Sequence, residues 1–353
     1  MAYKDVGKFW LNIAETCSII GEHLGQGKSF SVYKFHIPEN LIGTQFYPPS
    51  PTSIAVLKRP VVLETRIRLA RSTGSDFGMD HQSIRDIALE LRCLLHSPLS
   101  NHRNIIKLIG IGWETDGWDS RIRWPVPILE YADLGNLSVY QKQNPLLSYE
   151  TKRELCLDVA RALLVLHNCD VTHGDVNAKN ILVFSNPQGG VTAKLADFGC
   201  AVLAADSRSL LLGTEPWKAP EWKNILQTEN FKLTDVYSFG LLVWHVMMDG
   251  KKPFDDLVDQ NGSRQAIYNR IQRLKLNEEF TNIVKTSIEA YANLHRDIDV
   301  TKIKTVIEHT IQKDSANRNL MAAAVALNLY ISLLHWIKSL DVLTPTFYQK
   351  FPL

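Results

Sequence analysis

The hydrophobic pattern of the chain changes near residue 133, and this change constrains the fold more than any other feature of the sequence. Before it, glycine- and proline-rich segments separate short apolar runs, which predict strands at residues 32–36, 54–58, 105–111 and 126–131. One segment of this part, residues 84–96, has helical spacing. After residue 133 helical spacing dominates, at residues 149–167, 235–248, 265–276, 289–295, 301–312 and 322–340. The sequence therefore predicts an α+β chain with a strand-rich first part and a helical second part.

The length of 353 residues allows about two domains, since a typical domain has about 150 residues. We expect a leader over residues 1–17 with one or two helical turns, and then the two parts over residues 18–132 and 133–340. A tail would follow over residues 341–353. Residues 61–82 are charged and contain two glycines, so we expect a long loop there.

The charge of the chain is nearly balanced, with 39 Lys and Arg against 37 Asp and Glu, so the formal net charge is +2. We therefore expect no nucleic-acid partner. The five cysteines are widely spaced and form no C-x-x-C pair, which is typical of a reducing compartment and predicts a cytoplasmic protein. The apolar residues 320–337 include Asn328, Ser332 and His335, so a buried or amphipathic helix is favoured over a membrane span. We expect no membrane partner.

A glycine-containing segment occupies residues 25–32, Gly-Gln-Gly-Lys-Ser-Phe-Ser-Val. Gly25 and Gly27 would let backbone N–H groups approach phosphate groups, although an ordinary hairpin turn would look the same. Lys58 stands in an apolar strand and Glu90 in an apolar helix, and each charge is costly there unless it is paired. Either the two residues form an ion pair, or they are two solvated surface charges.

Two further segments carry oxygen ligands, namely residues 173–183 (His-Gly-Asp-Val-Asn-Ala-Lys-Asn-Ile-Leu-Val) and 196–199 (Ala-Asp-Phe-Gly). The side chains of Asn180 and Asp197 suit Mg²⁺, which binds few protein ligands and bridges phosphates. Asp175 is then the candidate base for an attacking hydroxyl. Taken singly, each segment could equally be a polar turn.

In this order and at these intervals, the segments resemble the signature set of the eukaryotic protein kinase family. Residues 219–221 (Ala-Pro-Glu) match the A-P-E motif of the family, and residues 235–240 (Asp-Val-Tyr-Ser-Phe-Gly) resemble its D-V-W/Y-S-x-G helix. Arg318 resembles the late arginine that pairs with the A-P-E glutamate, here Glu221. The resemblance covers residues 18 to 338. It implies a bilobal fold with a small β-rich N-lobe holding one main helix, and a larger α-helical C-lobe.

The resemblance also implies roles for individual residues. Lys58 would contact the α- and β-phosphates of ATP and Glu90 would hold Lys58, while Asp175 would orient or deprotonate the hydroxyl of a protein substrate. Asn180 and Asp197 would bind Mg²⁺, with Mn²⁺ as the alternative metal. Nucleotide contacts would come from the glycine-rich segment, from the hinge after Leu129 and from the adenine pocket, that is from Gly25, Gly27, Val32, Ala55, Glu130, Ala132 and Leu182.

The chain departs from the family pattern at several positions. Phe30 replaces the third loop glycine, and Gly174 replaces the arginine of H-R-D, so activity should not depend on a phosphorylated activation loop. Asn177 stands where Ser/Thr kinases place a lysine, and our hypothesis is that Lys179 supplies the missing charge. The intervals from Gly27 to Lys58 and from Lys58 to Glu90 are long for the family.

Thr214, in Gly-Thr-Glu-Pro-Trp-Lys at residues 213–218, resembles the threonine that bonds the catalytic aspartate in Ser/Thr kinases. Ser/Thr specificity is therefore favoured over Tyr, within a tyrosine-kinase-like group. The main expectation is an ATP- and Mg²⁺-dependent protein kinase. A pseudokinase scaffold that binds nucleotide weakly is the alternative, because of Phe30, Gly174 and Asn177. A small-molecule phosphotransferase is a third reading, which the Ala-Pro-Glu motif opposes.

Overall fold

A computed structural model describes ten stretches of the chain, residues 9–12, 21–27, 29–37, 54–72, 81–115, 123–203, 213–222, 231–259, 261–294 and 298–328. The chain divides into two compact units. The N-terminal unit comprises Met1–Asn101 and Ile106–Tyr131, and the C-terminal unit comprises His102–Ile105 and Ala132–Leu353. The N-terminal unit is built on a sheet and the C-terminal unit mainly on helices, which confirms the predicted α+β class.

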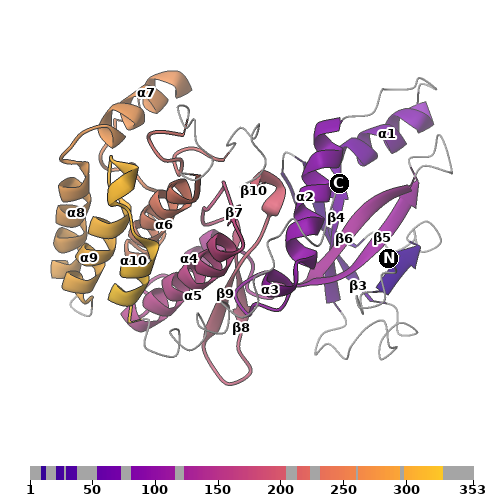
Figure 1. Ribbon diagram of the computed structural model, residues 1–353, viewed down its shortest axis with the longest axis horizontal. Coiled ribbons are helices and arrows are strands. Elements are labelled where there is room, and N and C mark those ends of the chain that lie inside the picture. The colour runs from indigo at the N-terminus through magenta and orange to yellow at the C-terminus, as the bar shows by residue number, and fades with distance from the viewer. Residues whose placement is uncertain are drawn as a thin grey trace. The chain divides into compact units, whose positions relative to one another are not determined.

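The sheet of the N-terminal unit has six strands in the order β1-β5-β6-β4-β3-β2 (Figure 1). The strands are β1 (Phe9–Asn12), β2 (Glu22–Gln26), β3 (Phe30–His36), β4 (Ile54–Pro60), β5 (Leu108–Thr115) and β6 (Arg123–Glu130). All neighbouring strands pair antiparallel except β1 and β5, which are parallel. The four predicted strands are confirmed, with ends shifted by up to four residues.

Strand β1 corrects the expectation of helical turns in residues 1–17 at residues 9–12, and the rest of that segment lies outside the described residues. The strand pairs with β5, so that Phe9 lies opposite Gly110 and Asn12 lies opposite Trp113. A four-residue aromatic and apolar run is too short to indicate a strand by periodicity. Its partner strand lies about a hundred residues later in the chain, so only the tertiary pairing defines it.

Helix α1 (Val61–Ser72) corrects the first part of the loop expected over residues 61–82, whereas residues 73–80 lie outside the described residues. Val62, Leu63 and Ile67 pack on the buried core of the unit at helical spacing, while charged side chains stand between them. The two glycines of this segment, Gly74 and Gly78, lie outside the described residues. Charge content alone was therefore a poor guide here.

The remaining helices of this unit are α2 (His81–Leu95), which confirms the predicted helix, and the short α3 (Ser97–Ser100). Ile87 of α2 and Leu63 of α1 join the core cluster of the sheet. The unit is thus a sheet and two longer helices around one apolar core, as Figure 1 shows for α1 and α2.

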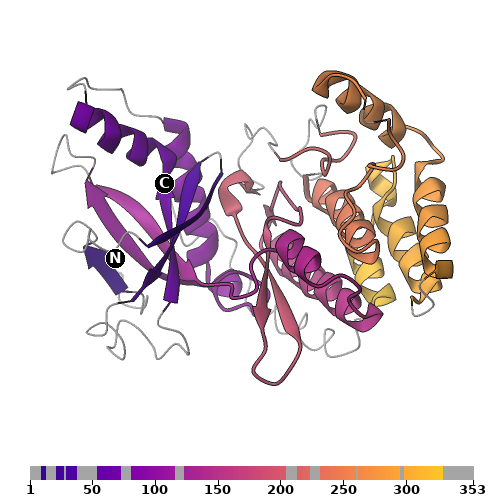
Figure 2. The ribbon, with the colours of Figure 1, turned by 180° about the vertical axis from the view of Figure 1, so that it is seen from behind.

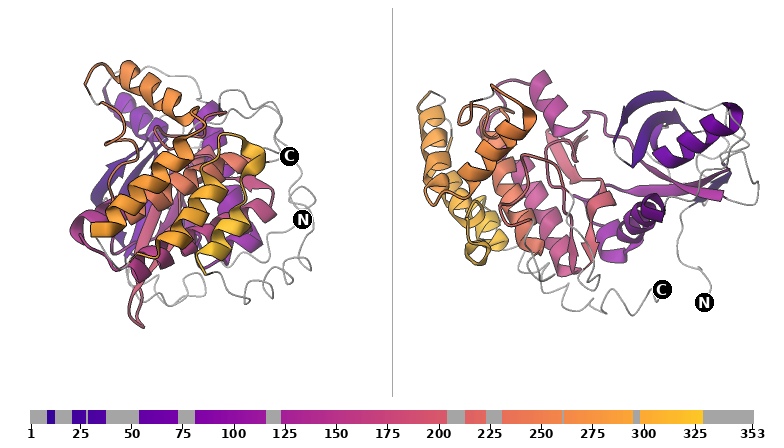
Figure 3. Two further views of the ribbon diagram at one scale, coloured as in Figure 1. Left: turned by 90° about the vertical axis from the view of Figure 1, so that its left-hand side faces the viewer. Right: turned by 90° about the horizontal axis from the view of Figure 1, so that it is seen from above.

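The described helices of the C-terminal unit are α4 (Leu137–Gln143), α5 (Tyr149–Asn168), α6 (Phe231–Met247), α7 (Arg264–Lys275), α8 (Phe280–Leu294), α9 (Val300–Thr310) and α10 (Leu320–Ala326). Helix α6 is buried along nearly its whole length, as its apolar sequence predicted, and it contacts α5, α8 and α9 (Figure 2). Helix α9 also contacts α8 and α10 (Figure 3). The predicted helices are confirmed where they are described, but α4 was not predicted.

The C-terminal unit also contains two short pairs of antiparallel strands. Strands β8 (Ile181–Ser185) and β9 (Val191–Leu195) pair antiparallel, as do β7 (Val171–Thr172) and β10 (Val202–Leu203). A 3₁₀ turn, η2 (Phe198–Cys200), follows β9. These pairs hold the polar segments at residues 173–180 and 196–199 between regular elements.

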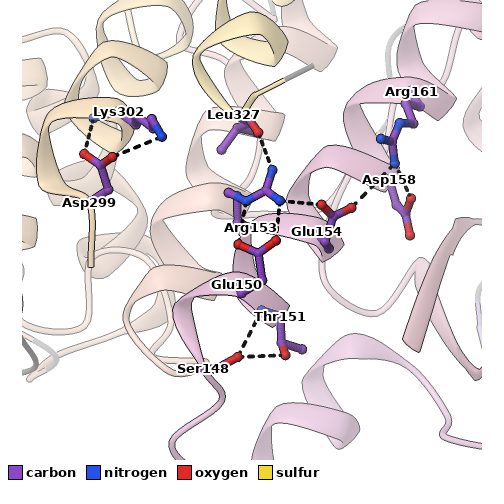
Figure 4. Close-up of polar contacts among 10 residues, drawn as sticks. All are labelled: Ser148, Glu150, Thr151, Arg153, Glu154, Asp158, Arg161, Asp299, Lys302 and Leu327. Carbon is purple, nitrogen blue, oxygen red and sulfur yellow. Dashed lines mark hydrogen bonds and ion pairs between the residues drawn. The ribbon is translucent and has the colours of Figure 1, made fainter. Parts of the chain in front are cut away.

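Polar contacts of Arg153 connect α5 to α10 (Figure 4). Its guanidinium donates to the backbone oxygen of Leu327 at 2.7 Å and forms ion pairs with Glu150 and Glu154. Ser148 caps the start of α5 by accepting a hydrogen bond from the Thr151 amide at 3.2 Å. The C-terminal end of α10 is therefore satisfied by a charged side chain from another helix.

The predicted helix at residues 322–340 is described only as far as α10, and the rest lies outside the described residues. None of the helices in the described ranges has the length and hydropathy that crossing a bilayer requires.

Gly240 allows α6 and α9 to approach closely. A Cβ at this position would lie 2.3 Å from Thr310 Oγ1 and 2.7 Å from Ile311 Cγ1. We expect Gly240→Ala to lower the free energy of unfolding by about 1–3 kcal/mol, because the overpacking outweighs the higher helix propensity of alanine. Urea unfolding would measure this. Gln265→Ala, on the exposed face of α7, should change stability by less than about 0.5 kcal/mol, and equal stabilities of the two variants would contradict the close packing.

Candidate active site

Lys58 and Glu90 form a buried ion pair inside the N-terminal unit. The Lys58 Nζ atom lies 2.6 Å from Glu90 Oε1 and 2.8 Å from Oε2. The side chains are only 7% and 0% exposed. Lys58 lies in β4 and Glu90 lies in α2, so the ion pair connects the helix to the sheet. The reading of two solvated surface charges is therefore wrong.

The register of β3 and β4 decides which side chains share a face with Lys58. Val32 lies directly opposite Lys58, and Val56 stands two residues before Lys58, so all three point to the same face. Ala55 points to the other face, where it is fully buried in the core cluster with Leu57. This corrects the expectation that Ala55 and Val32 line one surface, and Val56 takes that place.

The two glycines of the glycine-rich segment are not required by local packing. A Cβ at Gly25 would meet nothing within 4 Å, and one at Gly27 would meet only the Phe30 oxygen, at 3.7 Å. The Gly27 amide donates to that same oxygen at 2.8 Å and closes the turn. Space is thus left beside the backbone, as a bound phosphate group would need.

Phe30, in place of the third glycine, is buried against Lys58. The side chain is 4% exposed, and the Lys58 Nζ atom lies 4.4 Å from the centre of its ring.

Glu130, the last residue of β6, was predicted as part of the hinge. Its Oε1 atom accepts a hydrogen bond from the Lys107 amide at 2.8 Å. The carboxylate of Glu130 therefore binds the backbone of the segment just before β5.

Asp175 stands at the centre of a hydrogen-bonded loop in the C-terminal unit. Asn180 Nδ2 donates to the backbone oxygen of Asp175 at 2.8 Å and to its Oδ2 at 2.9 Å. Thr214 Oγ1 donates to the same Oδ2 at 3.1 Å. The other carboxylate oxygen, Oδ1, is buried and has no hydrogen-bond partner among the described residues. One oxygen of Asp175 is thus held in place while the second remains an acceptor for another group.

Asn177 is part of the same loop and faces inward. It is 3% exposed, its Nδ2 donates to the Asp175 backbone oxygen at 3.0 Å, and its Oδ1 accepts from the Lys179 amide at 2.9 Å. The side chain of Lys179 is exposed. The Asn177 side chain thus stabilises the backbone of the loop, and the Lys179 side chain presents a positive charge to solvent.

Asp235, near the start of α6, supports the backbone of this loop. It is 1% exposed and accepts hydrogen bonds from the amides of His173 at 2.7 Å and Gly174 at 2.9 Å, and from His167 Nε2 at 2.9 Å. Gly174 has a φ of +77°, in the left-handed region that favours glycine. The buried carboxylate holds the loop in this backbone conformation.

Asp197 precedes the turn η2 and has a φ of +66°, uncommon for a residue with a side chain. The following residue, Phe198, is fully buried and packs edge-on against the His173 ring, with centroids 5.2 Å apart. His173 Nε2 donates to the Ala196 backbone oxygen at 3.0 Å. These contacts connect the segment at residues 196–199 to the Asp175 loop.

The two remaining candidates of this unit are Ala132, just before α4, and Leu182, in β8. Ala132 is buried and Leu182 is half-buried. Leu182 forms an isolated β-bridge with Asn136, four residues after Ala132, so the two candidates come from neighbouring chain segments.

Lys275, at the end of α7, anchors the segment that follows Thr214. Its Nζ atom donates to the Lys218 backbone oxygen at 2.7 Å and lies 3.4 Å from Glu215 Oε2. Its side chain is fully buried, and burial lowers the pKa of Lys275 to about 8, although Glu215 opposes the shift. The ammonium therefore connects α7 to this segment.

Arg318 and Glu221 form the ion pair that the resemblance implied. Arg318 Nη1 lies 2.5 Å from Glu221 Oε1, and Nη2 lies 2.9 Å from Oε2. The same guanidinium donates to the backbone oxygens of Leu233 and Gln312. This prediction is confirmed.

The family model described as "Protein kinase domain" matches residues 77–329, more than half of the chain. The chain belongs to the protein kinase family. This match reaches from α2 to the end of the described C-terminal unit, and it includes Glu90, Asp175, Asn180 and Asp197.

Several curated protein kinases are similar to part of this chain. The probable L-type lectin-domain containing receptor kinase S.5 of Arabidopsis thaliana is 32% identical over 197 residues, which cover 52% of this chain and 28% of that protein. The serine/threonine/tyrosine-protein kinase HT1 of Arabidopsis thaliana is 37% identical over 123 residues, 34% of this chain and 30% of its own length. The probable serine/threonine-protein kinase roco11 of Dictyostelium discoideum is 32% identical over 159 residues, 44% of this chain and 10% of its own length. The matched part thus spans less than a third of each of these kinases.

Sequence reasoning missed three features of this kinase domain. Asp235 was noted only as part of a helix motif, although a charge in an apolar helix is itself a signal for a buried acceptor. Val56, rather than Ala55, shares a face with Lys58, and this could have been predicted because side chains two residues apart on a strand point to the same face. No local signal indicated Lys275, because its partners lie about sixty residues earlier in the chain.

Proposed function

We propose that the chain is an ATP- and Mg²⁺-dependent protein kinase that transfers the γ-phosphoryl group of ATP to a Ser or Thr hydroxyl of a protein substrate. The observation that carries this proposal is the state of the Asp175 carboxylate. Its Oδ2 is held by Asn180 and Thr214, while Oδ1 is buried and without a partner among the described residues. A carboxylate oxygen in this state is suited to accept the hydrogen bond, and then the proton, of a substrate hydroxyl.

The other residues have chemistry that fits ATP and Mg²⁺. The Asn180 side-chain amide donates both to the backbone oxygen and to Oδ2 of Asp175, which leaves its carbonyl oxygen for a metal, and Asp197 adds a carboxylate. Mg²⁺ would neutralise charge on the phosphate groups. Lys58, held by Glu90, would bind the α- and β-phosphates. Val32 and Val56, rather than Ala55, would contact the adenine ring from the sheet, and Leu182 from β8.

Ser/Thr specificity is supported by the hydrogen bond from Thr214 Oγ1 to Asp175 at 3.1 Å. The names of two relatives, roco11 and HT1, describe them as serine/threonine kinases, and that of HT1 also includes tyrosine. We therefore propose Ser/Thr as the main acceptors and Tyr as the minor one, with Lys179 supplying the cation that Asn177 cannot.

A pseudokinase scaffold remains the second candidate, because Phe30 covers the ammonium of Lys58. Such a protein would bind nucleotide weakly and act through protein contacts. The third reading, a small-molecule phosphotransferase, gains no support, since the Arg318–Glu221 pair belongs to the part of the chain that resembles protein kinases.

A transfer assay distinguishes the first two candidates. The full chain would be incubated with γ-labelled ATP, Mg²⁺ and peptide pools that contain Ser, Thr or Tyr as the single acceptor. We expect Mg²⁺-dependent label on the Ser and Thr pools, with Asp197→Asn protein as the background. Equal label from the two proteins would contradict the proposed activity and favour the scaffold.

Activity should not depend on phosphorylation of the activation segment. Gly174 has no side chain, so it offers no cation to a phosphate on Thr214, or on Ser207 and Ser209, which lie outside the described residues. We expect phosphatase-treated protein to keep its rate within about twofold, measured with the same peptides. Loss of activity on dephosphorylation, with recovery when Ser207 or Ser209 is rephosphorylated, would contradict this expectation.

A further inference from the structure

Phe30 points to the same face of the sheet as Lys58. In the β3–β4 register Phe30 lies opposite Pro60 and Val32 lies opposite Lys58, so Phe30 and Lys58 are diagonal neighbours on one face. This is also the face of Val32 and Val56, the proposed adenine contacts. An aromatic ring therefore stands in the row of side chains that would meet the nucleotide.

The ring of Phe30 covers the ammonium of Lys58. Nζ lies 4.4 Å from the ring centroid, inside the range of a cation–π contact, and both side chains are nearly buried. The same ammonium also donates to both carboxylate oxygens of Glu90. We expect a phosphate oxygen that binds Nζ to compete with the ring, because Glu90 occupies the ammonium with both carboxylate oxygens.

The residues before and after Phe30, Ser29 and Ser31, are held by hydrogen bonds. Ser29 Oγ donates to Asp86 Oδ2 at 2.9 Å, and the Ser29 oxygen accepts from the Val61 amide at 2.9 Å. Ser31 Oγ donates to Glu64 Oε2 at 2.7 Å. These anchors come from α1 and α2 and hold the backbone on both sides of Phe30, whose side chain belongs to the buried core cluster of the unit.

We propose that Phe30 is a gate that sets the affinity of the nucleotide site for phosphate groups, an inference that rests on the proposed function. With the ring over Lys58 the site is closed to phosphates, and rotation of the side chain away from Nζ opens it. The chain thus keeps the Lys58–Glu90 pair assembled without nucleotide, and each nucleotide that binds must displace the ring.

The test compares Phe30→Gly and Phe30→Leu with the unaltered chain. Leucine keeps most of the buried volume but has no π face, so it serves as the variant that folds if glycine does not. Phe35→Leu is the matched control, because Phe35 is a buried residue of the same strand on the opposite face. Titration calorimetry with MgADP gives the dissociation constant of each protein.

We expect MgADP to bind about tenfold more tightly to Phe30→Gly, or about 1.4 kcal/mol, which is the size of a partly desolvated cation–π contact. Phe30→Leu should bind about threefold more tightly or better, and Phe35→Leu within twofold of the unaltered chain. If the unaltered chain binds MgADP and both Phe30 variants bind it equally well, the gate is refuted while the nucleotide site stands.

A second measurement does not need nucleotide. Trinitrobenzenesulfonate, a small anion that reacts with amines, would label Lys58, and mass spectrometry of the peptide would give the rate. We expect labelling at least about fivefold faster in the two Phe30 variants and unchanged in Phe35→Leu. If none of the proteins binds MgADP, the proposed function fails. Faster labelling would then still support the cover over Lys58, and equal labelling would refute it.

Discussion

Asp175→Asn is expected to lower the rate of phosphoryl transfer by about 10²- to 10⁴-fold, the usual contribution of a general base. The variant keeps the shape of the side chain and an oxygen that can accept from Asn180 and Thr214. It loses the second carboxylate oxygen, Oδ1, which is buried without a partner in the described residues. Initial rates on the preferred peptide pool would measure the effect.

Binding of MgADP by this variant should stay within about threefold, because Asp175 is assigned to the hydroxyl and not to the nucleotide. Asp170→Asn is the matched control, since Asp170 is exposed and forms an ion pair with Lys232 on the surface. A rate within fivefold of the unaltered chain would show that Asp175 does not act as the base.

Asp235→Asn should destabilise the C-terminal unit by about 3 kcal/mol. The buried carboxylate accepts from two amides and from His167, and an asparagine must turn an N–H₂ group toward at least one of these donors. The substitution is nearly isosteric, so the loss would come from the hydrogen bonds and the charge rather than from a cavity. Urea unfolding followed by circular dichroism would measure it.

Asp170→Asn again serves as the control and should change stability by less than about 0.5 kcal/mol, because asparagine tolerates the φ of +57° at this position. A loss below 1 kcal/mol for Asp235→Asn would mean that the loop around His173 and Gly174 does not depend on this acceptor.

The sequence predicted well where the signal was local. The helix that carries Glu90, the strand that carries Lys58 and the buried helix α6 all follow from apolar periodicity within a single segment. The segments around Asp175 and Asp197 could be assigned because their order and intervals match one family. These predictions needed no knowledge of which segments meet in space.

The sequence predicted poorly where a contact joins distant segments. Strand β1 exists through its pairing with β5, and α1 was hidden by its charged face, of which Glu64 is bonded to Ser31 and Tyr33. The face to which Ala55 points depends on its register with Phe35 in the neighbouring strand. Such errors arise because periodicity reports only the local conformation.

By itself the sequence determined the α+β class, the kinase resemblance and the residue types that could handle a phosphate and a metal, because these are properties of short segments and their order. Only the tertiary structure decided that Lys58 and Glu90 are a buried pair, that Asp235 holds the Asp175 loop and that the ring of Phe30 lies over Lys58. Each of these depends on a distance between residues far apart in the chain, which the packing of the core determines.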